Sequence, residues 1–223
     1  MFNFNNKKKQ PNEMAEMADA RESLYDLLVK IINHLPDEDF LNKIKTRVFE
    51  EVFEGFSGVE HIEAYRSQTD GNSSDEIITE LAVDRTKILR GTGHKELKPP
   101  HEGCYIKDSD IGSAAIKVRS FYRKAGLLPD ESIPEAPDYL CVELDFMKNL
   151  CLREKEQWLS GEDGSETLAL EKSFLTEHLG CWMGDFCSAT NKHAVTDFYR
   201  GFCEILGEVI TMDLEYLKAL PKK

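Results

Sequence analysis

The chain has 223 residues, of which 41% are apolar and 31% charged, and its formal net charge is −13 at pH 7. This length and composition are typical of a soluble globular protein, and no stretch reaches the ~18 apolar residues that a membrane-spanning helix needs. The acidic balance disfavours nucleic acid as a partner, because phosphate binding requires clustered Lys and Arg, and it suits a basic peptide.

The N-terminal segment and the cysteines both predict a cytoplasmic protein. Residues 1–13 carry a basic patch that no apolar stretch follows, so we expect a disordered tail and no secretory signal. The six cysteines form no CxxC pair, which in a chain of this length without a signal peptide indicates reduced, mostly buried thiols.

Helical periodicity dominates the first half of the chain. Apolar residues recur at helical spacing over 14–35, over a second stretch that ends near Gly55, over 58–66 and over 75–90. Turn-forming residues separate the last two stretches. Four helices are therefore predicted in this half.

A proline-led segment at 95–105 interrupts the helical pattern, which then resumes. Helical spacing predicts further helices over 108–125, 138–159, 165–188 and 192–219. No stretch shows the alternation of a strand, and no internal repeat is present. The sequence predicts an all-α fold, a helical bundle of about 8–10 helices.

Two prolines, Pro134 and Pro137, shape the segment before the helix expected at 138–159. Neither can donate a backbone hydrogen bond, and each pushes the preceding residue toward extended geometry, so no helix continues through them. Pro137 suits the first turn of the following helix, and Asp138 places a negative charge where the helix dipole favours it. The sequence predicts a stiff, acidic connector that leads into an amphipathic helix.

No pattern in the sequence predicts catalysis. The phosphate-binding patterns GxxxxGK[ST] and GxGxxG and the nucleophile pattern GxSxG are all absent. Glu143 and Asp145 lie two residues apart and point to different helix faces, which does not suit a paired-carboxylate catalyst. His101 beside Glu102 fits a solvated loop pair. We expect a protein that is not an enzyme, with no catalytic residue and no cofactor.

His178, Cys181 and Cys187 are the candidate metal ligands in the sequence. Helical spacing brings the first two together, but Cys187 lies more than a turn beyond them. A closed structural zinc site takes four ligands, usually in two close pairs. Core lining explains the set better, so we expect no metal site.

Four stretches resemble the motifs of one protein family, in consistent order. They are a proline-led loop that ends in an aromatic residue (99–105), a V-x-x-F-Y-x-x-x-G-L helix end (118–127), an E-x-x-D-x-x-x-x-E-L-x-F-M signature (135–147) and an F-x-x-x-H-L-x-x-W signature (174–182). In these stretches the chain is similar to the TorD/DmsD family of redox enzyme maturation proteins, the cytoplasmic chaperones of molybdenum-cofactor enzymes.

This resemblance implies an all-helical protein of two lobes, 14–130 and 138–223, joined by a hinge at 131–137. It implies a chaperone of anaerobic respiration that binds an apo-molybdoenzyme catalytic subunit and its twin-arginine leader peptide, and that delays export until the cofactor is inserted. An acidic protein suits this task because guanidinium–carboxylate pairs are directional and charge-assisted.

The resemblance also assigns leader-binding residues in this sequence: Pro137, Asp138, Tyr139, Glu143, Pro100 and Tyr105. The family commonly has His where this chain has Tyr139. Tyr donates a hydrogen bond and stacks, but it does not titrate near neutral pH. The apolar residues of the motifs, and their histidine, are expected in the core: Phe121, Tyr122, Phe146, Met147, His178, Leu179 and Trp182.

Three other functions stay open. The nitrate-reductase assembly branch of the same superfamily guards an enzyme that remains in the cytoplasm and does not depend on paired arginines. A GTP-binding or GTP-hydrolysing protein is a second alternative, although the missing phosphate loop argues against it. A metal- or redox-responsive regulator would use the six cysteines. Monomer and domain-swapped dimer both remain possible, because a proline-bounded connector permits exchange of a lobe between chains.

Overall fold

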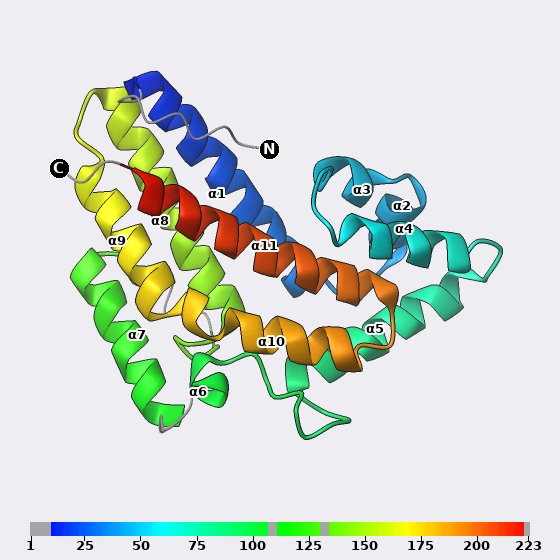
Figure 1. The fold of residues 1–223 in the computed structure, drawn as a ribbon. Helices are drawn as coiled ribbons and strands as arrows, with labels where there is room; N and C mark the ends of the chain where they lie inside the picture. The colour runs from blue at the N-terminus through cyan, green and yellow to red at the C-terminus, as the bar shows by residue number, and fades with distance from the viewer. Residues whose placement is uncertain (1–9, 107–110, 130–133, 221–223) are drawn as a thin grey trace. The chain divides into compact units, whose positions relative to one another are not determined.

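The computed structural model describes residues 10–106, 111–129 and 134–220. Within these ranges the chain forms eleven α-helices and no strand (Figure 1). A single antiparallel bridge in the same ranges joins His101 to Tyr139. The prediction of an all-α bundle is confirmed. The helices are α1 (Pro11–Asn33), α2 (Glu38–Lys45), α3 (Val48–Val52), α4 (Val59–Gln68), α5 (Ser74–Arg90), α6 (Glu102–Tyr105), α7 (Ile111–Ala125), α8 (Leu140–Ser160), α9 (Ser165–Glu177), α10 (Leu179–His193) and α11 (Asp197–Ala219).

Two of the predicted helices are each divided in two. Arg47 adopts a left-handed backbone conformation with φ 67°, which an α-helix cannot contain, so α2 ends before it and α3 begins after it. His178 has φ −129° and ψ −101°, so the helix predicted over 165–188 forms as α9 and α10. Neither break contains Gly or Pro, the residues that usually signal one.

Several predicted boundaries also differ from the structure. The helices predicted over 165–188 and 192–219 do not separate at 189–191, because α10 continues to His193 and α11 begins at Asp197. The helix α1 begins at Pro11, so residues 11–13 are helical and not part of a tail. Residues 1–9 of the predicted tail lie outside the described ranges. The short helix α6 forms inside the proline-led loop, and α8 begins at Leu140, two residues later than predicted.

The chain forms two compact units, each assembled from separate stretches of sequence. Among the described residues, the first comprises 10–33, 101–106, 111–129, 134–182 and 210–220, and the second comprises 34–100 and 183–209. The helices α10 and α11 therefore contribute to both units.

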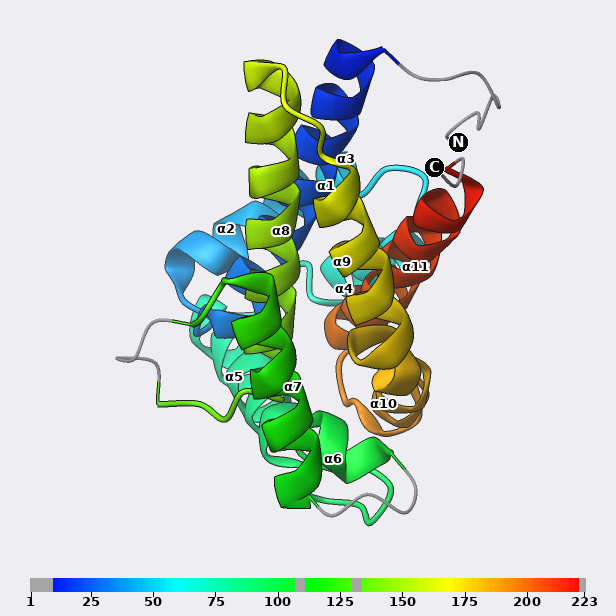
Figure 2. The ribbon, with the colours of Figure 1, turned by 90° about the vertical axis from the view of Figure 1, so that its left-hand side faces the viewer.

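This division differs from the predicted lobes, which placed one boundary in the connector at 131–137. The N-terminal helix α1 packs along α8, in the second half of the chain, and so joins a unit with residues distant in sequence (Figures 1 and 2). Residues 131–133 of the connector lie outside the described ranges. The connector residues from 134 to 137 belong to the first unit.

The core of the first unit is rich in aromatic side chains. Phe146 packs against two other rings, with its ring centroid 4.4 Å from that of Tyr122 and 4.6 Å from that of Phe174. The prediction that the apolar motif residues are buried is confirmed for the whole predicted set: Phe121, Tyr122, Phe146, Met147, His178, Leu179 and Trp182.

A buried ionic cluster also crosses the first unit. Arg21 of α1 pairs with Glu154 of α8 at 2.8 Å, and also with Glu171 of α9 and Asp213 of α11. Burial raises the pKa of Glu171 to about 8, although the Arg21 guanidinium acts to lower it. One guanidinium thus faces three carboxyl groups, which favours a proton on one of them near neutral pH.

The second unit combines an aromatic core with a buried capping carboxylate. Asp84 of α5 is fully buried and accepts the N–H groups of Val195 and Thr196 at 2.9 and 2.8 Å, which fixes the turn before α11. Three aromatic rings pack in this unit with centroids 5.2 to 5.4 Å apart: Phe40, Phe49 and Phe198.

Candidate functional site

The candidate site centres on Asp138, which joins the connector to the α6 turn. Its Oδ2 accepts the Gly103 N–H at 3.2 Å, and its main-chain oxygen accepts the Glu102 N–H at 2.9 Å. His101 Nδ1 lies 3.5 Å from Oδ1 of Asp138. His101 is the N-cap of α6, but its own side chain makes no capping bond. Asp138 therefore supplies, from a distant part of the sequence, the acceptors that the N-terminus of α6 needs.

This arrangement corrects the predicted roles of Asp138 and Pro137 in the first turn of α8. The N-cap of α8 is Tyr139, and Pro137 lies before it, outside the helix. Asp138 is 1% exposed, and its carboxylate faces α6. Burial acts to raise the pKa of Asp138, but the hydrogen bonds with His101 and the Gly103 N–H outweigh it, so the pKa lies below its ordinary value.

The accessible part of the site is formed by Pro137, Tyr139 and Glu135. Tyr139 is half-buried, and its ring centroid lies 5.2 Å from that of His101. Pro137 is also half-buried, and its carbonyl oxygen accepts the Tyr122 hydroxyl at 2.8 Å, which ties the connector to α7. Glu135 is exposed. An anchored turn thus presents a proline, an aromatic ring and a carboxylate to solvent.

A buried layer surrounds Glu143 of α8. Trp182 Nε1 donates to Glu143 Oε2 at 3.2 Å, and the Tyr105 ring stacks on Trp182 with centroids 5.6 Å apart. Oε1 of Glu143 has no hydrogen-bond partner within the described residues. Burial raises the pKa of Glu143 well above its ordinary value, and the neighbouring Glu102 carboxylate raises it further. This environment disfavours the ionised form of Glu143.

Glu102 pairs with His178, which links α6 to the break between α9 and α10. His178 Nδ1 lies 3.0 Å from Glu102 Oε2, and both residues are buried. The prediction of a solvated His101–Glu102 pair is therefore wrong for Glu102, because its side chain points into the core. The break between α9 and α10 lies at His178, the residue that makes this contact.

The structure brings five of the six predicted site residues into the first unit: Pro137, Asp138, Tyr139, Glu143 and Tyr105. Pro100 is buried and is the last residue of a segment of the second unit. The sequence analysis did not assign His101, Glu102 and Trp182 to the site. Their occurrence within the motifs at 99–105 and 174–182 was a signal that could have indicated them.

The predicted metal candidates do not form a ligand set. His178 pairs with Glu102, and Cys187 is buried and hydrogen-bonds with Cys203. Cys181 is exposed, which contradicts its assignment to the core, and its Sγ donates to the Thr176 carbonyl oxygen at 2.8 Å. A different group of possible ligands does lie close together in the described part of the chain: His94, Glu96 and His193.

The chain is similar to a family and to several named proteins. A family model described as nitrate reductase delta subunit matches residues 57–188. The chaperone protein TorD of Vibrio vulnificus (strain CMCP6) is 26% identical over 141 residues, which cover 62% of this chain and 64% of the relative. TorD of Aeromonas salmonicida is 32% identical over 146 residues, which cover 64% and 63%. The perchlorate reductase assembly chaperone protein of Dechloromonas aromatica is 24% identical over 115 residues, which cover 52% and 51%.

These similarities confirm the resemblance to the TorD/DmsD family that the four motifs predicted. The chain spans less than two thirds of the length of these relatives, whose names describe chaperones and not enzymes. No solved structure matches the chain. Among the described residues, no helix is both long and apolar enough to cross a membrane.

Proposed function

The chain belongs to the nitrate reductase delta subunit family, and from this premise we propose that it is an assembly chaperone of a molybdenum-cofactor oxidoreductase. It binds the apo form of the catalytic subunit and its twin-arginine leader in the cytoplasm, and it delays export until the cofactor is in place. It acts by binding, without catalytic turnover. The observation that carries the proposal is the similarity to TorD and to a perchlorate reductase assembly chaperone.

In this proposal the leader contacts the accessible part of the connector. Glu135 offers an exposed carboxylate, which pairs with a guanidinium in a directional, charge-assisted manner. Tyr139 offers a partly exposed ring on which a guanidinium stacks. The net charge of −13 attracts a basic segment over a longer range.

The buried candidates hold this contact surface in place. Asp138 fixes the connector against α6, which carries Tyr105. Tyr105 stacks on Trp182, which donates a hydrogen bond to Glu143 in the first turn of α8. We assign Pro100 the role of directing the chain into the α6 turn, because its ring restricts the backbone immediately before His101. In this proposal the buried candidates, Asp138, Tyr105, Glu143 and Pro100, support the contact surface and do not touch the leader. Pro137, Tyr139 and Glu135 contact the leader directly.

A second candidate client is a nitrate-reductase-type enzyme that stays in the cytoplasm. The family description, nitrate reductase delta subunit, favours it. Binding of this client does not depend on paired arginines, so the effect of replacing those arginines on binding distinguishes the two candidates. In both cases the chain is a binding protein.

Co-production of the chain with a candidate apo-enzyme tests the proposal. The enzyme is made with its native leader, or with both leader arginines changed to lysine, and with or without the chain. We expect the native form to co-purify with the chain and to contain more molybdenum when the chain is present. Co-purification that survives the lysine changes supports the nitrate-reductase-type client. Equal molybdenum content with and without the chain, and no co-purification, overturns the proposal.

A further inference from the structure

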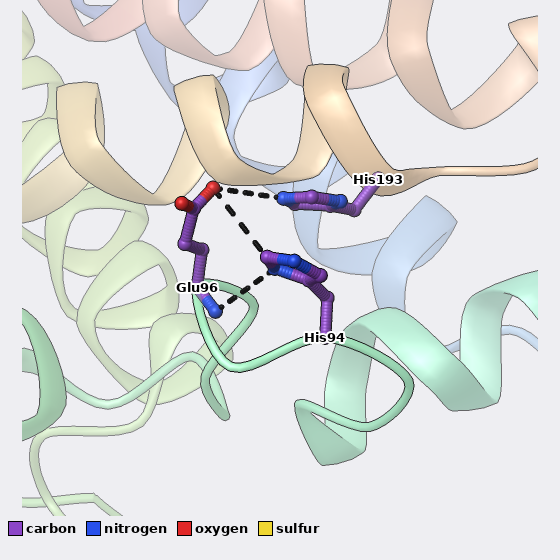
Figure 3. Close-up of side chains that lie close together, drawn as sticks. All are labelled: His94, Glu96 and His193. Carbon is purple, nitrogen blue, oxygen red and sulfur yellow. Dashed lines mark hydrogen bonds and ion pairs between the residues drawn. The ribbon is translucent and has the colours of Figure 1, made fainter.

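Two histidines and a glutamate of the second unit converge on one point (Figure 3). His94 and Glu96 lie in the loop after α5, and His193 is the last residue of α10. Glu96 Oε2 lies 3.0 Å from His193 Nε2 and 4.0 Å from His94 Nδ1. The two imidazole rings stack with centroids 3.9 Å apart and an interplanar angle of 17°. Each residue offers one ligand atom within 4.8 Å of the other two.

We propose that His94, Glu96 and His193 bind one divalent transition-metal ion, with Zn²⁺ as the best match. Two imidazole nitrogens and one carboxylate oxygen are a donor set that suits zinc, and a water molecule completes the tetrahedron. Bonds of about 2.0–2.1 Å place neighbouring ligand atoms of a tetrahedral zinc ion about 3.3 Å apart. Two of the observed separations, 3.0 and 4.0 Å, bracket this value. Small movements of the side chains therefore complete the site.

The loop that carries His94 and Glu96 is held in a closed shape. Gly91 adopts a left-handed conformation with φ 59°, and a Cβ atom there would clash with the backbone at Pro99, so the two ends of the loop touch. Leu97 is buried, and its N–H donates to the His94 carbonyl oxygen at 3.1 Å. This anchoring keeps both ligand-bearing residues on the same turn and lowers the entropy cost of binding an ion.

The third ligand is positioned by α5. Lys87 Nζ donates to the His193 carbonyl oxygen at 2.9 Å, and the buried Asp84 carboxylate accepts the Val195 and Thr196 N–H groups just beyond. The end of α10 is thus tied to α5 at the His193 carbonyl and at two residues that follow it. A bound ion crosslinks the loop to α10 within the second unit, so ion binding stabilises that unit.

Lys192 competes with the ion for the Glu96 carboxylate. Its Nζ lies 2.7 Å from Glu96 Oε2, and its side chain is 61% exposed, so it can turn away into solvent. Removal of Lys192 leaves this oxygen open to the ion and takes away a nearby positive charge. The affinity for the ion therefore rises when Lys192 is replaced.

Calorimetric titration of the full chain with Zn²⁺ alone tests the site. All proteins carry Cys181→Ser, because Cys181 is an exposed thiol and thiolates are zinc ligands that would compete with the site. We expect one ion per chain and at least a tenfold loss of affinity in His94→Ala and in His193→Ala, because each removes one of three protein ligands. We expect Lys192→Ala to bind more tightly. His34→Ala is the matched control, since His34 pairs with a single carboxylate, Asp37, at 3.1 Å.

A thermal unfolding measurement gives a second readout. Zn²⁺ raises the Tm of the parent and of His34→Ala, and EDTA reverses the rise, whereas the double variant His94→Ala/His193→Ala shows no rise. If the double variant and the parent unfold with similar cooperative transitions in EDTA, the two substitutions have removed only the ion site and not the fold. The proposal is overturned when the parent binds no zinc, or when the double variant binds it as tightly as the parent does.

Discussion

The Asp138 carboxylate accepts a hydrogen bond from the Gly103 N–H at 3.2 Å, across a separation of 35 residues. This bond joins the proline-led loop at 99–105 to the signature at 135–147, so two motifs that are distant in sequence form one structural site. The carboxylate satisfies the N-terminus of α6, which has no capping side chain of its own. The shape of the accessible connector therefore depends on a buried residue.

Asp138→Ala should lower the free energy of unfolding by about 1–3 kcal/mol, because it leaves the buried Gly103 N–H without its acceptor. Asp145→Ala is the matched control on the same stretch of chain, since Asp145 is half-buried and bonds to Lys148 of its own helix. Its loss should cost less than about 1 kcal/mol. Urea unfolding of both variants measures the difference. Equal costs would show that the bond to α6 contributes little.

Arg21→Met should destabilise the protein strongly, by about 3–5 kcal/mol, because it leaves three buried carboxyl groups without their cation. The double variant Arg21→Met/Asp213→Asn should recover part of this loss, since it removes one of the buried carboxylates that Arg21 paired with. Lys30→Met serves as the control, because Lys30 forms an exposed ion pair. Urea unfolding decides the outcome, and a double variant no more stable than Arg21→Met would contradict the assignment.

Glu171 should make the stability fall as the pH rises from 5 to 8. Its pKa is raised from 4.5 to about 8 in the folded protein, so the folded state keeps a proton that the unfolded state releases. The stabilisation is complete below pH ~4.5 and is lost as the pH approaches 8, with a limiting slope of about 1.4 kcal/mol per pH unit.

Glu171→Gln should remove this component of the pH dependence, and urea unfolding at pH 5, 6, 7 and 8 measures it. Glu177→Gln, on an exposed position of α9, should leave the pH profile of the parent unchanged. Parallel profiles for the parent and Glu171→Gln would contradict the raised pKa.

Tyr139→Ala should weaken binding of a twin-arginine leader by roughly tenfold, because it removes a partly exposed ring next to the connector. Tyr139→Phe should keep most of the affinity, since the stacking surface remains. Phe56→Ala, at another half-buried aromatic residue, is the matched control and should leave the affinity unchanged. Fluorescence titration measures all three. Unchanged binding by Tyr139→Ala would remove this residue from the contact.

Helical periodicity predicted most of the fold, because each long helix carries one continuous apolar face. The breaks at Arg47 and His178 escaped prediction, since neither residue is a helix breaker by type. At His178 the break accompanies a buried bond to Glu102, 76 residues away in sequence. Such a tertiary contact overrides local preference. Likewise, the place of α1 beside α8 follows from packing that periodicity alone does not specify.

The candidate site was only partly predictable for a related reason. The motifs indicated Asp138 and Glu143, but their spacing could not show that both side chains point inward. The role of Asp138 depends on its hydrogen bond with Gly103. The proposed ion site depends on the contact between His193 and Glu96, which are 97 residues apart in sequence. Contacts of this kind arise when the chain folds, and a one-dimensional pattern carries no signal for them.

Titration of the full chain with a synthetic twin-arginine leader from a molybdenum reductase tests the central claim most directly. A control peptide has both arginines replaced by lysine, which keeps the charge but removes the planar, bidentate donors. We predict micromolar or tighter binding of the leader and at least tenfold weaker binding of the control. Equal binding of the two peptides, or no binding of either, would contradict a chaperone that recognises the leader through paired arginines.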